Sequence, residues 1–233
     1  PNQTHLQGLA VQPAKVMLAY HGLDFDRFPA PNDGRGTRDG ADATDPAIVL
    51  SVGRAVEKKG YDVLIDALAR LPQRLNWRLI HIGGGEGLKK LKQRARRAGI
   101  GDQIEWLGSR AQDEVLRRYR AADLFVLACR IGHNGDRDGL PNVLMEAQSQ
   151  GLACVSTRLP SIAELIEDGV TGMLVPPEDP AALASALERL IATPSLRAGF
   201  GRAGLDRMRE RFSFERGIDL LASRFGLGAQ PAE

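Results

Sequence analysis

Two cations, Arg54 and Lys59, lie where the sequence could bind an anion. They belong to the segment SVGRAVEKKG, in which an apolar run ends at Gly53 and a helical pattern begins near Tyr61. Arginine can hold phosphate oxygens through two N–H groups at once, and lysine adds a point charge. A helix N-terminus adds free amides and a partial positive charge. The spacing therefore favours a diphosphate site, although by itself the segment also fits a solvated basic loop.

A second segment, DRDGLPNVLMEA, places two acids around the start of a helix. Pro141 fits the first position of that helix, and Glu146 would lie one turn further along, leaning back toward the N-terminus. A carboxylate at that point would repel phosphate but could accept hydrogen bonds from ribose hydroxyls. Asp138, just before the turn, could reach a hydroxyl of a sugar. The amides expected to be unpaired and open to an anion are those of Asn142, Val143 and Leu144.

Short, nearly continuous apolar runs alternate with helical patterns along the chain. Such runs are typical of strands buried on both faces of a parallel sheet. The expected strands are Val16 to Tyr20, Ile48 to Val52, Arg78 to Ile82, Gln103 to Leu107, Asp123 to Ala128 and Leu152 to Ser156. Helical patterns begin near Tyr61, Glu86, Ala111, Pro141, Ser161 and Pro180. This order predicts an α/β fold with a doubly wound, mostly parallel, Rossmann-like sheet, whose ligands bind beyond the carboxyl ends of the strands.

The chain of 233 residues is expected to form a single domain. Residues 13–193 would make the α/β core, and residues 194–233 a set of C-terminal helices. Residues 29–47 are rich in Pro, Gly and Asp and separate two expected strands, which predicts a long mobile loop rather than a linker between domains. Asp179 followed by Pro180 predicts the N-cap and the first residue of a helix.

Composition argues against several classes of protein. The formal net charge is +2, so no strong positive field points to nucleic acid as a partner. No apolar run approaches the roughly 20 residues that a membrane-spanning helix needs, and no signal peptide is evident. The two cysteines, Cys129 and Cys154, match no metal or redox spacing and suit a reducing compartment as buried thiols. We therefore expect a cytoplasmic globular protein.

Taken together, the motifs resemble those of the C-terminal, nucleotide-sugar-binding lobe of the retaining group 1 family of bacterial glycosyltransferases. The family's glycine-arginine turn with a downstream Lys-Gly is matched by Gly53-Arg54 and Lys59-Gly60. Its two acids separated by seven residues are matched by Asp138 and Glu146, with GLPNVLM between them. The other matching segments are HGLDFDRF, LIHIGGGEG, YRAADLFVLA and EDGVTGMLVPPEDP, so the resemblance covers nearly the whole chain.

The resemblance implies the GT-B fold, with two Rossmann-like lobes, and retaining transfer of a hexose from a nucleoside diphosphate sugar without a metal or other cofactor. Arg54 and Lys59 would bind the donor diphosphate and stabilise the charge that it gains as the glycosidic bond breaks. Glu146 would bind the ribose, and Asp138 would orient the transferred sugar. The residues expected near the nucleobase are Ser109 and Arg110. Further donor contacts would come from Gly53, Gly139, Leu140, Pro141, Asn142 and Val143.

The same resemblance places the acceptor in an N-terminal lobe that this chain does not contain, so the chain alone would bind donor without transferring sugar. The expected partners are a UDP- or GDP-linked sugar and that lobe, and the expected products are envelope polysaccharides or glycolipids. Six cations between Lys89 and Arg97 fit either a solvated helix surface or contact with anionic lipid at the inner face of the membrane.

Three positions depart from the family's pattern. Asp138 stands where the family has Glu, so its carboxylate reaches about 1.5 Å less, one C–C bond. His21 replaces the Asn of an Asn-Gly turn, a position where a lone histidine is more often structural than catalytic. Pro160 and Ser161 replace two glycines near the expected cleft.

Three alternative functions fit parts of the sequence. Asp136 and Asp138, with His133 nearby, resemble the Asp-x-Asp element that holds a divalent metal in the other glycosyltransferase fold. The run GGGEGL from Gly83 follows a strand and opens a helix as in an NAD(P)-binding domain, but Leu88 occupies the place of the third glycine. A non-catalytic sensor of sugar nucleotides would carry the same binding residues as an enzyme.

Overall fold

The computed structural model describes residues 2–10, 16–31 and 36–227, and its centre is one sheet of six parallel strands. The strands are β1 (Ala47–Val52), β2 (Trp77–Ile82), β3 (Ile104–Gly108), β4 (Leu124–Leu127), β5 (Ala153–Thr157) and β6 (Gly172–Val175). They lie in the order β3-β2-β1-β4-β5-β6, and every neighbouring pair is parallel. The predicted doubly wound α/β fold is confirmed.

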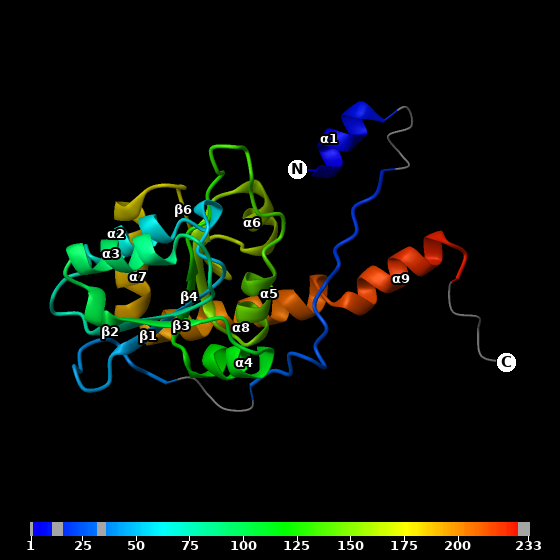
Figure 1. Ribbon diagram of the computed structural model, residues 1–233. Helices are drawn as coiled ribbons and strands as arrows, with labels where there is room; N and C mark the ends of the chain where they lie inside the picture. The colour runs from blue at the N-terminus through cyan, green and yellow to red at the C-terminus, as the bar shows by residue number, and fades with distance from the viewer. Residues whose placement is uncertain (1, 11–15, 32–35, 228–233) are drawn as a thin grey trace.

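Helices cover both faces of this sheet (Figure 1). The helices of the described residues are α1 (Asn2–Leu9), α2 (Tyr61–Leu68), α3 (Leu88–Arg97), α4 (Gln112–Ala121), α5 (Asn142–Ser149), α6 (Pro160–Leu165), α7 (Pro180–Ala192), α8 (Pro194–Arg211) and α9 (Phe214–Arg224), with short 3₁₀ turns at Glu57–Lys59 and Gly101–Gln103. Of these, α1 and α9 lie away from the sheet. Helix α2 packs against α3 and α7, whereas α5 packs against α8 on the opposite face. Asp179 is the predicted N-cap of α7, and its carboxylate accepts hydrogen bonds from the amides of Ala181 and Ala182.

The core lies where apolar runs were expected to become strands. All four residues of β4 and all five of β5 are buried, because helices cover both of their faces. Strand β6, which the sequence analysis did not anticipate as a strand, adds Gly172 beside Cys154 at the edge of the sheet. Both cysteines are buried thiols, so Cys154 is the small core residue that its apolar surroundings predicted.

The strand expected at Val16 to Tyr20 is wrong. These residues form no ladder with the sheet, and the nearest described bridge along the chain is the isolated one between Leu23 and Ser213. Tyr20 instead packs against Phe212 at the end of α8, with ring centroids 4.9 Å apart. An apolar run becomes a strand only where a sheet edge is available, and this segment lies against helices instead. The helix α1 was not expected either.

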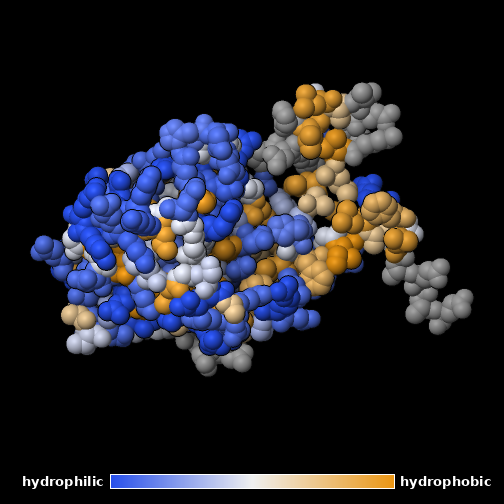
Figure 2. Space-filling model, in the orientation of Figure 1, coloured by the Kyte–Doolittle hydropathy of each residue, from blue (hydrophilic) through white to orange (hydrophobic). Residues whose placement is uncertain are grey.

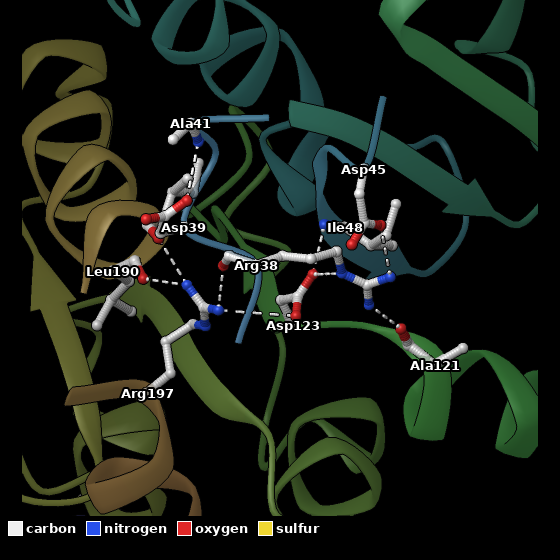
Figure 3. A network of polar contacts seen from close by, with 10 residues as sticks. Arg38, Asp39, Ala41, Asp45, Ile48, Ala121, Asp123, Leu190 and Arg197 are labelled. Atoms are coloured by element: carbon white, nitrogen blue, oxygen red, sulfur yellow. Dashed lines mark hydrogen bonds and ion pairs between the residues drawn. The ribbon is translucent and has the colours of Figure 1, made fainter. Parts of the chain in front are cut away.

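The described part of the expected mobile loop is tied to the core by an arginine. Arg38 Nε donates to the buried carboxylate of Asp123 at 2.8 Å, and the amide of Ile48 donates to the same oxygen at 2.7 Å. Arg197, only 3% exposed, donates to the carbonyl oxygens of Leu190, Ile191 and Arg38 and lies 3.7 Å from Asp123 Oδ1 (Figure 3). This network joins the loop to the starts of β1 and β4 and to the α7–α8 junction.

Some of the domain limits expected from the sequence cannot be compared with the structure. Residues 13–15, 32–35 and 228–233 lie outside the described residues, so mobility of the whole 29–47 segment stays a prediction. Helices α8 and α9 occupy Pro194–Arg211 and Phe214–Arg224, and the division into a core and a set of C-terminal helices stays a prediction.

Exposed apolar side chains gather at one end of the molecule. Figure 2 shows hydrophobic residues over α1 and α9, whereas the α/β body in the same view is mostly hydrophilic. The exposed large hydrophobics of that end are Leu6, Leu9, Leu18, Ile218, Leu221, Phe225 and Leu227. Among the described residues no helix has the length and apolar character needed to cross a membrane.

Candidate functional site

The sheet has its topological switch between β1 and β4. From β1 the chain moves outward to β2, and from β4 it moves the other way to β5. Open α/β sheets bind their ligands in a crevice beyond the carboxyl ends of the strands at such a point, and the region beyond the ends of β1 and β4 is called the crevice below. The turns that follow them are in contact, since the amide of Arg130 donates to the carbonyl of Lys58 at 2.9 Å. Gly60 has a φ of 60°, and a Cβ there would lie 1.8 Å from the carbonyl oxygen of Ala128. Only glycine permits this approach.

Lys59 and Asp138 meet across this crevice. Lys59 Nζ lies 2.7 Å from Asp138 Oδ2, and both side chains are only 13% exposed. The same oxygen accepts a hydrogen bond from the Cys129 thiol at 3.2 Å, and Lys58 Nζ lies 3.7 Å from Oδ1. Ser161 donates to the Asp138 backbone carbonyl at 3.1 Å, so a residue that departs from the family's pattern helps to hold this turn. The two predicted site residues are thus brought together as an ion pair.

Arg54 is exposed at the turn after β1. Its side chain makes no hydrogen bond or ion pair with any residue that the structure describes. Its charge acts on Lys58, whose pKa is raised by the hydrogen bond from its ammonium to Asp136 and lowered in part by Arg54. The crevice therefore has two lysines, Lys58 and Lys59, already paired with Asp138, and an arginine, Arg54, that is exposed to solvent.

The N-terminus of α5 lies at the same edge of the sheet, and the helix begins one residue later than expected. Pro141 is the N-cap rather than the first helical residue, and the amide of Leu144 donates to the Pro141 carbonyl at 3.0 Å. The expected open amide of Leu144 is therefore wrong, because the first turn closes on the proline carbonyl. The amides of Asn142 and Val143 have no hydrogen-bond partner among the described residues.

His21 reaches this helix start from the N-terminal segment. Its Nε2 lies 2.8 Å from Oδ1 of Asn142, and both side chains are exposed. This contact fits the structural role expected for a lone histidine at this position. The two residues are 121 positions apart, so no local spacing could have connected them.

Glu146 lies one turn inside α5, as expected. The hydroxyl of Tyr119 in α4 donates to its Oε2 at 3.0 Å, and Oε1 has no partner among the described residues. Burial raises the pKa of Glu146, while the Tyr119 hydrogen bond and the charge of Arg27 oppose the rise. One carboxylate oxygen of Glu146 is thus held in place by Tyr119.

Ser109 and Arg110 follow β3 at the same edge of the sheet, and both are exposed. Arg110 is partly engaged, because its Nε lies 3.2 Å from Glu114 Oε1 one turn into α4. A Cβ added to Gly84 would lie 3.5 Å from the Ser109 hydroxyl, so the turns after β2 and β3 are neighbours. A role at the nucleobase stays a prediction.

The glycines after β2 have a packing role that explains the run GGGEG. A Cβ at Gly83 would lie 2.0 Å from the Gly53 carbonyl oxygen, and one at Gly85 or Gly87 would lie 2.8 or 2.7 Å from backbone atoms of Ala55. The Ala55 amide donates to the carbonyl of Gly84 at 2.7 Å. These glycines let the turn after β2 lie directly on the turn that carries Arg54, so packing explains the glycine run without a dinucleotide.

The carboxylates of the Asp-x-Asp element are already neutralised. Asp136 Oδ1 accepts from Lys58 Nζ at 3.0 Å, Asp138 pairs with Lys59, and His133 Nδ1 bonds to Glu57. Within the described parts of the chain, no three His, Cys, Asp or Glu side chains are grouped as metal ligands would be.

His81 adds no charge to this edge. It is fully buried in β2, with its ring 4.6 Å from that of Tyr61, and burial lowers its pKa to about 4. A histidine with a pKa so far below 7 is neutral at physiological pH.

The chain belongs to the family described as glycosyl transferases group 1, which it matches over residues 37–207. Among similar proteins, it is 32% identical over 210 residues to the GDP-mannose-dependent alpha-(1-6)-phosphatidylinositol monomannoside mannosyltransferase of Mycolicibacterium smegmatis, a match covering 87% of this chain and 55% of that protein. It is 34% identical over 186 residues to the putative colanic acid biosynthesis glycosyltransferase WcaL of Salmonella typhimurium, covering 78% of this chain and 43% of that protein. The chain thus spans about half the length of these relatives.

Solved structures share the fold. The Anabaena protein Alr3699/HepE in complex with UDP superposes with a TM-score of 0.81 and 22% identity, over 96% of this chain and 61% of that one. The C-terminal domain of the group 1 glycosyl transferase LpcC from Francisella tularensis superposes with a TM-score of 0.68 and 25% identity, over 82% of this chain and 99% of that one. The described fold is therefore that of a Rossmann-like lobe of a GT-B glycosyltransferase.

Proposed function

We propose that this chain binds a nucleoside diphosphate sugar and forms the donor half of a retaining, metal-independent hexosyltransferase. The observation that carries the proposal is the cluster at the β1–β4 switch: exposed Arg54, Lys59 and the free amides of Asn142 and Val143. Two cations and a helix N-terminus are the groups that bind a diphosphate and stabilise the charge of its departure. Glu146, with one free carboxylate oxygen, would accept hydrogen bonds from the ribose.

The relatives support a donor of this class. HepE has been solved with UDP, and the M. smegmatis relative is named as dependent on GDP-mannose. The similarity to the putative colanic acid biosynthesis glycosyltransferase WcaL favours an envelope polysaccharide or glycolipid as the product. The nucleobase would lie near Ser109 and Arg110, and the amides of the Gly139–Val143 turn, apart from that of Pro141, would face the phosphates or the sugar.

A second lobe would complete the enzyme. The relatives are about twice as long as this chain, and the apolar side chains around α9 form a surface that a further lobe could cover. We place the acceptor site in that lobe, so the chain alone would bind donor without transferring sugar. The basic face of α3 would suit a cytoplasmic location against anionic lipid at the inner membrane face.

The donor class is tested by a thermal-shift panel of UDP-glucose, GDP-mannose and ADP-glucose, repeated with EDTA. We expect one of them to raise the melting temperature, because a ligand bound only by the folded state stabilises it. The shift should survive EDTA, since Lys58 and Lys59 already neutralise the two carboxylates that a metal would need. A shift lost with EDTA and restored by Mn²⁺ would make Asp136 and Asp138 a metal site. No shift with any member would remove the donor assignment.

Glu146→Gln should weaken binding of a ribonucleoside diphosphate by roughly 1 kcal/mol, because a neutral amide is a poorer acceptor than a carboxylate. The matched control is the 2′,3′-dideoxy analogue, which lacks the hydroxyls and should bind both proteins alike. Tyr119 can still donate to the amide oxygen of the variant, so the helix should remain in place. Equal losses for both ligands in titration calorimetry would rule out the ribose role.

A further inference from the structure

The two side chains expected to serve different parts of the donor are bound to each other. Lys59, expected at the diphosphate, lies 2.7 Å from Asp138, expected at the sugar. Asp138 is held there by more than one partner, since the Cys129 thiol donates to it and Lys58 lies 3.7 Å away. With no donor present, the carboxylate therefore takes the place of an anion at Lys59.

A diphosphate that uses Lys59 must displace this carboxylate or share the lysine with it. Sharing places like charges close together in a crevice where both side chains are only 13% exposed, so solvent screens the repulsion poorly. A free nucleoside diphosphate has no hydroxyl groups of a transferred sugar that could donate hydrogen bonds to the displaced carboxylate of Asp138. A sugar-bearing donor offers hydroxyl groups, which can donate to the released carboxylate and replace its lost partner.

From this competition we infer that Asp138 determines specificity: it makes the site prefer a nucleoside diphosphate sugar to the free nucleoside diphosphate by competing for Lys59 whenever no sugar is bound. The inference rests on the proposed function and deepens it. It also gives the product a route of release, because Asp138 can return to Lys59 once the sugar has left. Arg54, which is exposed and unpaired among the described residues, would hold the diphosphate before and after this exchange.

Asp136 provides a matched control two residues away. It is an aspartate of the same turn, it pairs with Lys58 rather than Lys59, and its side chain is 53% exposed. Removing its charge changes the net charge of the chain as much as the change at Asp138 does. A general electrostatic effect would therefore appear in both variants, whereas competition for Lys59 would appear in only one.

The experiment measures dissociation constants by calorimetry for three pairs of ligands: UDP with UDP-glucose, GDP with GDP-mannose, and ADP with ADP-glucose. The native chain should bind the sugar-bearing member of one pair about tenfold more tightly. In Asp138→Asn the affinity for the free diphosphate should rise about tenfold, while the donor gains little because it loses a charged acceptor. The preference should then nearly vanish in Asp138→Asn and persist in Asp136→Asn.

Several results would overturn the inference. The first is a native chain that binds the free nucleoside diphosphate as tightly as the sugar-bearing donor. The second is an Asp138→Asn variant that keeps the native preference for the donor. The third is an Asp136→Asn variant that loses this preference as fully as Asp138→Asn does. Thermal melts check folding, and Asp138→Ala serves as a second neutral variant if the asparagine variant is unstable. A native chain that binds none of the six nucleotides would instead contradict the proposed function, so the two failures are distinguishable.

Discussion

Asp123→Ala should lower the free energy of unfolding by about 3–5 kcal/mol, the usual cost of removing one partner from a buried ion pair. The carboxylate is 1% exposed and binds the Ile48 amide and Arg38 Nε. Its other oxygen lies 3.7 Å from the buried guanidinium of Arg197. Without Asp123, the charge of Arg197 would keep only carbonyl oxygens as partners, and the Arg38 segment would lose its anchor.

Urea denaturation followed by circular dichroism measures this change. The control is Arg74→Ala, which breaks a 2.7 Å ion pair with Glu188 whose arginine is 74% exposed. Exposed pairs contribute about 0–1 kcal/mol, so the control should unfold almost as the native chain does. A loss below about 1 kcal/mol for Asp123→Ala would mean that the network in Figure 3 is not a major source of stability.

Arg54→Ala and Lys59→Ala should each weaken binding of a nucleoside diphosphate by about 2–5 kcal/mol, because each removes a cation that the bound anion would desolvate. The larger loss is expected for Lys59→Ala. In that variant the 2.7 Å partner of Asp138 is gone, and the carboxylate remains in the crevice as a like charge beside the diphosphate.

Titration calorimetry with UDP and GDP gives the measurement. Lys89→Ala is the control, since Lys89 is an exposed cation of α3 outside the crevice. It removes the same formal charge and should change affinity by less than the binding variants. Unchanged affinity in both Arg54→Ala and Lys59→Ala would remove the diphosphate assignment.

Local patterns in the sequence were enough for much of the fold. The run Ile48 to Val52 lies in β1, because a short and almost uninterrupted apolar run is typical of a strand buried on both faces of a parallel sheet. The N-cap at Asp179 was equally predictable, since a carboxylate before a proline satisfies the free amides at a helix start. The exception, Val16 to Tyr20, has the same local character but no sheet edge beside it.

The site was predictable as a set of residue types but not as an arrangement. Arg54, Lys59, Asp138 and Glu146 could be named because strand ends and helix starts are where an α/β protein binds anions and hydroxyls. The partners that these side chains contact in the folded chain could not be predicted from strand ends and helix starts. The glycines from Gly83 to Gly87 have the pattern of a nucleotide-binding loop, yet they serve contact with the turn of Ala55.

What the sequence determined by itself was therefore periodicity, burial and the chemistry available at each strand end. Only the tertiary structure decided that Lys59 pairs with Asp138, that His21 meets Asn142, and that Asp123 joins two arginines. The physical reason is that periodicity is a property of neighbours along the chain. A partner across the crevice depends on which strands lie side by side, and the order β3-β2-β1-β4-β5-β6 is settled by packing of the whole sheet and its helices.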